Sequence, residues 1–274
     1  MAGYAGRMGV LTVEITSFGV VMTANSQPIE AVDGETRVLG HGGRWHTRNP
    51  ILTRDAGGFT GFTGYVGTET IGGKQTRDWL DAFGATHPTE SLADYAHALG
   101  QELTDAWQRF GLSSVLEILI SGVENGDVRF WFVRNSDGLY SNGTYQAPKA
   151  AFDAVDDLDG NYVPNDLRPG QTKEELLRER TYSFRQGALL PAAGIFDVFR
   201  DILVTLYGHG IDGFTPIASL DDLGHFARQR LEFVKRLYSK KHGIYRKPLG
   251  PTGGKVHVVG VCRDGAIRKY SKIR

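Results

Sequence analysis

The sequence lacks a second cysteine, an excess of either charge and any long hydrophobic run. Cys262 stands alone and cannot form an internal disulfide, and its place in an apolar strand is typical of a core thiol rather than a nucleophile. Lys and Arg together number 31, as do Asp and Glu, so the formal net charge is zero. Proteins that bind nucleic acid or anionic membranes usually carry a basic excess, so neither partner is expected.

Membrane and secretion signals are also missing. No apolar run is long enough to cross a bilayer, and the amino-terminal residues show no signal-peptide pattern. We therefore expect a cytoplasmic protein. Its 274 residues, 41% of them hydrophobic, suffice for a core of good size. A neutral surface also offers little charge repulsion against self-association.

Two pairs of β-branched, apolar runs lie near the ends of the chain. The first covers Leu11–Ser26 and turns at Ser17–Gly19, whereas the second covers Lys255–Tyr270 and turns at Arg263–Gly265. Both patterns predict β-hairpins. Apolar and polar residues alternate at the start of the first run, which predicts a strand with one exposed face.

The central part of the chain alternates between strand and helix patterns. Further strand pairs are expected over residues 51–67 and 115–134, and residues 148–180 are predicted to be an insertion or an extended loop with a short helix. Helices are expected over Thr68–Phe83, Ser91–Phe110, Gly187–Tyr207 and Ser219–Tyr238. This order favours a single α+β domain over residues 1–274, built as a four-layer αββα sandwich.

Four segments stand in an order that one known family shares. They are GVVMTANS at Gly19–Ser26, GFTGYVGT at Gly61–Thr68, ILISGVENGDVRFWFVRNSDG at Ile118–Gly138 and GGKVHVVGVCRDGAIRKY at Gly253–Tyr270. Together they resemble the second strand, the entry to the first helix, the central hairpin and the closing strands of a proteasome-type subunit. That family belongs to the N-terminal-nucleophile hydrolase superfamily. The resemblance implies the sandwich fold and a subunit that self-associates or joins related subunits in a ring or helix.

The same resemblance locates the family's catalytic positions, and each holds an unsuitable residue. Active members use a processed N-terminal threonine, activated by its own amino group with a lysine and an aspartate. Aligned on Gly19, the nucleophile position falls on Gly9, the aspartate position on Asn25, and the lysine position near Arg48 or Asn49. Glycine has no hydroxyl, asparagine carries no charge, and arginine stays protonated. The resemblance therefore implies a catalytically degenerate subunit with a structural or partner-binding role.

One catalytic alternative stays open in the sequence. Removal of a leader would expose Thr12, which could then act as the nucleophile of an active threonine-type peptidase or amidohydrolase. The interpretation we favour for Thr12 is an outward-facing strand threonine, because threonine is common in half-exposed strands.

Other motifs give weaker signals. The segment Gly67–Thr76 is a near miss to a phosphate-binding loop and is better explained as a Gly-rich entry to a helix. His41 and His46 share a loop without further metal ligands at a recognisable spacing, so no metal or cofactor is expected. A basic run is interpreted as a solvated helix end or as a docking face for a protein partner. It includes Lys235, Arg236, Lys240 and Lys241.

Overall fold

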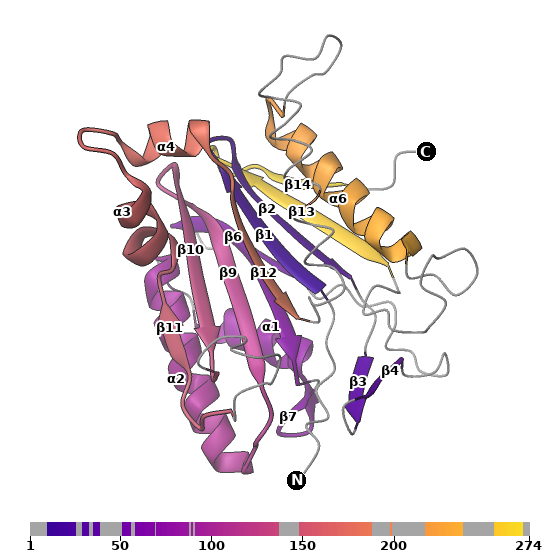
Figure 1. The fold of residues 1–274 in the computed structure, drawn as a ribbon. Helices are drawn as coiled ribbons and strands as arrows, with labels where there is room; N and C mark the ends of the chain where they lie inside the picture. The colour runs from indigo at the N-terminus through magenta and orange to yellow at the C-terminus, as the bar shows by residue number, and fades with distance from the viewer. Residues whose placement is uncertain are drawn as a thin grey trace.

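The chain folds into mixed α and β structure around two five-stranded antiparallel sheets (Figure 1). The computed structural model describes residues 10–25, 29–32, 35–38, 51–55, 58–68, 70–87, 89, 91–136, 148–187, 198, 217–237 and 255–270. The first sheet has the order β12-β1-β2-β13-β14. Its strands are β12 (Tyr182–Gly187), β1 (Val10–Thr16), β2 (Gly19–Asn25), β13 (Val256–Cys262) and β14 (Ile267–Lys269).

The second sheet has the order β11-β10-β9-β6-β5. Its strands are β11 (Asp153–Val155), β10 (Asp127–Arg134), β9 (Leu116–Glu124), β6 (Phe59–Gly67) and β5 (Ile51–Asp55). Two small strand pairs stand apart from these sheets: β3 (Ile29–Val32) with β4 (Glu35–Val38), and β7 (Thr70–Ile71) with β8 (Lys74–Gln75). The helices are α1 (Thr76–Thr86), α2 (Leu92–Phe110), α3 (Val163–Asp166), α4 (Lys173–Glu179) and α6 (Leu220–Leu237). A short π-helical turn covers Leu158–Tyr162.

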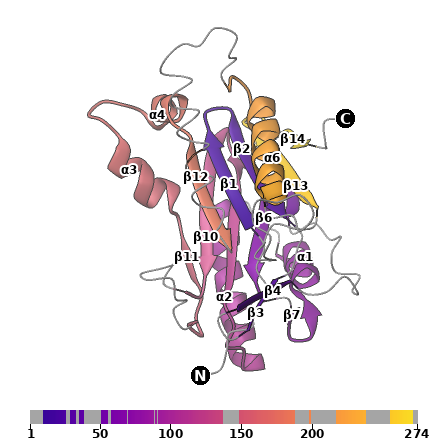
Figure 2. The ribbon, with the colours of Figure 1, turned by 45° about the vertical axis from the view of Figure 1, so that its right-hand side comes forward.

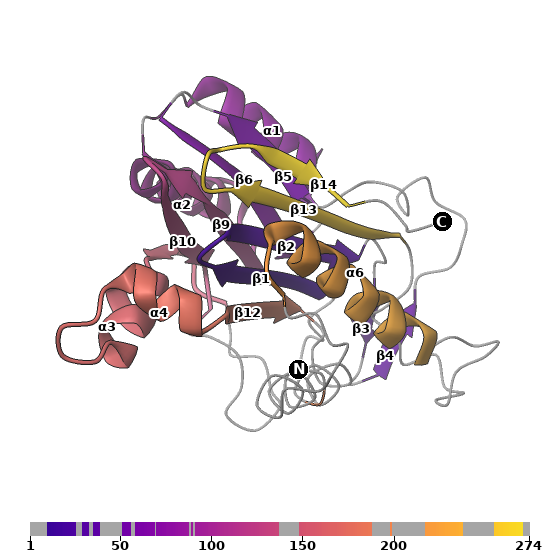
Figure 3. The ribbon, with the colours of Figure 1, turned by 90° about the horizontal axis from the view of Figure 1, so that it is seen from above.

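Buried apolar side chains gather in three clusters among the described residues. One joins the facing sides of the two sheets, with Leu11 and Val13 of β1 packed in the same cluster as Leu119 of β9. A second lies between the β9 sheet and helices α1 and α2, and a third lies between the β2–β13 pair and α6. Figure 3 shows α1 and α2 on one side of the strands and α6 on the other. Each sheet therefore has apolar contacts on both faces.

Strand β1 is buried along its whole length, so the prediction of one exposed face is wrong. Its apolar side chains enter the cluster between the sheets, as predicted, but Thr12 and Glu14 are also covered. Helix α6 lies over this side of the sheet (Figure 2) and pairs Arg230 with Glu14. Alternation along a strand shows that its two faces differ, but it does not show that the polar face meets water.

The second and fourth predicted helices are present at almost the expected bounds. Ser91 caps α2, since its hydroxyl oxygen accepts the Asp94 N–H at 3.0 Å. Ser219 accepts the Asp222 N–H at 3.1 Å in the same way at the start of α6. Both helices bury an apolar stripe on a sheet, which accounts for the success of the periodicity rule.

The first predicted helix begins eight residues later than expected, at Thr76 rather than Thr68. The intervening Gly-rich segment instead forms the β7–β8 hairpin, which turns through Gly72 and Gly73 at φ of 56° and 81°. Glycine adopts this left-handed conformation without a Cβ penalty. The near miss to a phosphate-binding loop is thus a β-turn. The predicted helix over residues 187–207 lies almost wholly outside the described residues, although Gly187 itself ends strand β12, which the sequence did not predict.

Residues 148–180 contain regular structure and contribute to the core. Strand β11 extends the second sheet beside β10, and Leu158, Val163 and Leu176 enter the cluster between the sheets. The segment is therefore more ordered than an extended loop. Whether it is an insertion relative to other proteins stays a prediction.

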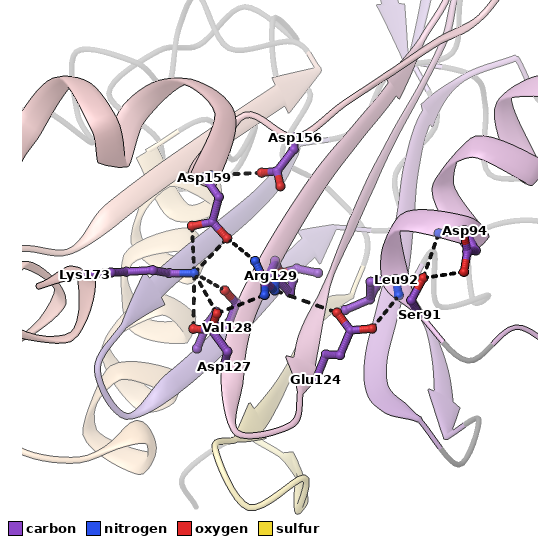
Figure 4. A network of polar contacts seen from close by, with 11 residues as sticks. Ser91, Leu92, Asp94, Glu124, Asp127, Val128, Arg129, Asp156, Asp159 and Lys173 are labelled. Carbon is purple, nitrogen blue, oxygen red and sulfur yellow. Dashed lines mark hydrogen bonds and ion pairs between the residues drawn. The ribbon is translucent and has the colours of Figure 1, made fainter.

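A network of ion pairs connects residues 148–180 to the start of β10, next to the β9–β10 turn (Figure 4). Asp159 contacts Lys173 Nζ at 2.7 Å and Arg129 Nη1 at 2.6 Å. Lys173 also donates to the Val128 carbonyl at 2.8 Å and lies 3.2 Å from Asp127. These ion pairs join the π-helical turn, α4 and the start of β10.

Candidate functional site

The end of β2 meets the start of β1 at the position where the resemblance places catalytic residues. Asn25 is buried, and its Oδ1 accepts the Val10 N–H at 2.6 Å. The side chain therefore holds the first residue of β1, directly after the expected nucleophile position. A neutral amide can accept this hydrogen bond, but it supplies no negative charge to a neighbouring cation.

The other expected catalytic positions, Gly9, Arg48 and Asn49, lie outside the described residues. Strand β5 begins at Ile51, which pairs with Gly64 of β6. A Cβ on Gly64 would lie 2.8 Å from Cδ1 of Leu11. The start of β5 therefore lies at the same end of the sheets as the start of β1.

Thr12 lies in the middle of the first sheet, where it pairs with Arg185 of β12 and Thr23 of β2. It is 1% exposed, so it does not meet solvent although it lies on the outer face of the sheet. Its Oγ1 has no hydrogen-bond partner among the described residues, and the same is true of Thr23 Oγ1. The hydroxyl is covered on a face of the sheet that α6 overlies, away from the cluster between the sheets.

A buried ion pair lies on the same face, and the sequence did not predict it. Glu14 of β1 meets Arg230 of α6, and both are at most 6% exposed. Burial lowers the pKa of the Arg230 guanidinium, whereas the Glu14 carboxylate against it favours the charged form. The sequence feature that could have predicted this pair is the position of Arg230 within the apolar stripe of α6, beside Leu231 and one turn from Ala227.

A second buried carboxylate, also not predicted, lies where β9 begins. Glu117 is 2% exposed, and Ser136 Oγ donates to its Oε1 at 2.8 Å. Burial raises the pKa of Glu117, although the hydrogen bond from Ser136 and the charge of Arg134 act in the opposite direction. The adjacent Asn135 accepts the Leu116 N–H at 3.0 Å and fixes this corner of the sheet.

The structure places only part of the predicted basic run. Lys235 lies in the last turn of α6, 3.7 Å from Glu232, and Arg236 is exposed beside it. Lys240 and Lys241 lie outside the described residues, as do His41 and His46. Among the described residues, no group of three or more metal-binding side chains comes together, and no helix is long and apolar enough to cross a membrane.

Comparison with known proteins identifies relatives by structure alone. No protein-family model matches the chain, and no curated protein matches it in sequence. Among solved structures, the Anbu (Gly-1) mutant from Hyphomicrobium sp. strain MC1 superposes with a TM-score of 0.51 at 12% identity, covering 96% of this chain and 86% of that chain. Anbu from Yersinia bercovieri, described as an ancestral β-subunit, gives 0.51 at 12% identity and covers 95% and 85%. The fold of this chain is therefore similar to that of the two Anbu structures.

Proposed function

We propose that this chain is a catalytically degenerate proteasome-like subunit, which acts as a structural or partner-binding component of a self-assembling complex. Its architecture on this proposal is the four-layer αββα sandwich, with α6 outside one sheet and α1 and α2 outside the other. The three apolar clusters support this arrangement. The likeness to Anbu, described as an ancestral β-subunit, supports the assembly role.

The observation that carries the degenerate assignment is the neutral side chain of Asn25, which lies beside the start of β1. The expected acid position is occupied by a neutral amide, and its oxygen is engaged by the backbone at 2.6 Å. An acid at this position would hold a nearby lysine in the charged state and so tune a free amine near neutral pH. The neutral amide of Asn25 provides no negative charge to a neighbouring lysine.

The location of Thr12 does not support the enzymatic alternative. A new amino terminus at Thr12 would remove Val10 and Leu11 from β1, and with them two apolar side chains that are at most 1% exposed. It would also remove the N–H that Asn25 binds. Burying two such side chains stabilises a fold by roughly 1.5–3 kcal/mol each, so cleavage there would cost stability.

The test compares peptide hydrolysis by the wild type with Thr12→Ala and Thr23→Ala. These two threonines face each other in the same sheet, are equally buried and lack hydrogen-bond partners among the described residues, so they form a matched pair. We expect no hydrolysis by any of the three proteins and an intact amino terminus by mass measurement. Hydrolysis that only Thr12→Ala abolishes, with covalent labelling of Thr12 by an epoxyketone, would replace the proposal with the active hydrolase.

A further inference from the structure

A hollow lies beside α6 at the ends of β13 and β14, and residues from both faces of these strands line it. These three elements run beside one another in Figures 1 and 3. The cavity has a volume of about 480 Å³. Its walls combine valine and tyrosine surface with charged side chains, among them Arg228, Glu232, Lys235, Lys255 and Lys269.

Positive charge dominates this hollow, although the chain as a whole is neutral. Four cationic side chains line it, against the single carboxylate of Glu232. That carboxylate is already shared, since it lies 3.6 Å from Arg228 and 3.7 Å from Lys235. A concave surface with walls of low dielectric concentrates such a field and attracts negatively charged groups.

His257 also lines the hollow, where the same cations act on it. Burial lowers its pKa, and the charges of Lys255, Arg228 and Arg77 lower it further. Its Nε2 is buried and has no hydrogen-bond partner among the described residues. The imidazole is therefore neutral near pH 7 and adds no charge of its own.

The spacing of the cations indicates what kind of anion fits. Arg228 and Lys235 are two helical turns apart on α6, which separates them by roughly 10 Å along the axis. Arg228 is held in place because it donates to the Tyr270 carbonyl at 2.7 Å and to the Val256 carbonyl at 3.3 Å. Arg228 and Lys235 are thus too far apart to contact one phosphate group together. They match several carboxylates along an extended chain.

We propose that this hollow is a docking site for an extended acidic segment of a protein partner, with carboxylates opposite the cations and apolar side chains against Val256 and Tyr270. The inference rests on the partner-binding role proposed above and names its surface and chemistry. It also gives the Lys235 end of the basic run specific neighbours, because Lys255 directly precedes β13 and Lys269 lies in β14.

The test uses full-length protein and a fluorescein-labelled peptide in which Glu alternates with Val or Leu. We expect saturable binding by fluorescence anisotropy that weakens as salt increases. Lys269→Glu, and its combination with Lys235→Glu, should weaken binding at least tenfold. The matched control is Arg109→Glu, an equal change of charge at an exposed position of α2, which packs on the other sheet. It should leave the affinity unchanged.

Several outcomes would overturn the docking site. Equal binding of a peptide with Gln in place of Glu, or an equal loss in Arg109→Glu, would show that the hollow does not select carboxylates. Saturable binding of inorganic tripolyphosphate, measured by calorimetry, together with no binding of the peptide would assign a phosphate ligand instead. Circular dichroism of each variant checks that it is folded. Native mass spectrometry of the same samples separates the two proposals: an assembled protein that ignores the peptide contradicts the docking site alone, and a monomer that binds it contradicts the assembly alone.

Discussion

Asn25 differs from an aspartate only in its NH2 group, which replaces one carboxylate oxygen. The side chain can therefore accept a hydrogen bond, but it carries no negative charge. Aspartate and asparagine have nearly the same shape, and both can accept the Val10 N–H. Only the carboxylate would also raise the pKa of a neighbouring amine by charge. On the proposal above, this position keeps the backbone contact of the strand pair but lacks the charge of an acid.

Loss of the Asn25 side chain is expected to destabilise the protein. Asn25→Ala removes the only acceptor described for the buried Val10 N–H, and an unsatisfied buried donor costs about 1–3 kcal/mol. Urea unfolding monitored by circular dichroism measures the change. Asn165→Ala is the control, because its amide donates to Asn161 at an exposed site and its loss should cost less than about 0.5 kcal/mol. Equal effects of the two substitutions would contradict a structural role for Asn25.

The second residue-scale prediction concerns pH. Burial raises the pKa of Glu117 above its usual value of 4.5, so the folded state binds this proton more tightly than the unfolded state does. The stability that this group contributes is therefore fully present below pH 4.5 and is lost as pH rises through the folded pKa. Glu117→Gln removes the titration and retains an oxygen that can accept from Ser136. The free energy of unfolding of Glu117→Gln, minus that of the wild type, should therefore increase as pH rises. A difference that stays constant from pH 4 to pH 8 would contradict the argument.

At the scale of elements, the sequence predicted those features that depend on local pattern. The caps at Ser91 and Ser219 and the apolar stripes of α2 and α6 follow from a few neighbouring residues, and both helices were found. The start of α1 was missed because Gly72 and Gly73 could equally lead into a helix or turn a hairpin. The burial of Thr12 could not be predicted, since α6, which covers it, lies about two hundred residues away in the chain.

The contact between β1 and α6 supplies an element-scale prediction. Glu14→Ala leaves Arg230 buried without its carboxylate, and breaking a buried pair in this way costs about 3–5 kcal/mol. The double variant Glu14→Met and Arg230→Met replaces both charges by apolar groups and should recover much of that loss. Asp81→Ala, which breaks the exposed pair with Arg77, is the control and should cost less than about 0.5 kcal/mol. Chemical denaturation measures all of these. A double variant less stable than Glu14→Ala would show that the pair itself stabilises the fold.

At the scale of the whole molecule, the proposed assembly depends on the charge and the outer surfaces of the chain. Its charge balance leaves no strong repulsion between copies, and its two helical layers face outward on opposite sides (Figure 3). The cationic hollow lies beside α6, whereas α1 and α2 belong to the other layer. Assembly through one layer would therefore leave the other layer accessible to a partner.

We expect the self-association to use the layer of α1 and α2, because the hollow proposed for a partner lies beside α6. A substitution on the exposed face of α1 tests this. Ala82 is exposed on α1, and Ala82→Arg keeps a good helix-forming residue while placing a long charged side chain on that layer. We expect native mass spectrometry and light scattering to show an oligomer for the wild type and at least a tenfold weaker one for Ala82→Arg. Gln229→Arg adds the same charge at an exposed position of α6 and should assemble like the wild type. A wild type that is monomeric at micromolar concentration would contradict assembly altogether. If Gln229→Arg alone weakens the assembly, the contact between copies lies on the α6 layer. Another copy would then cover the hollow beside α6, and the acidic segment could not reach it in the assembled protein.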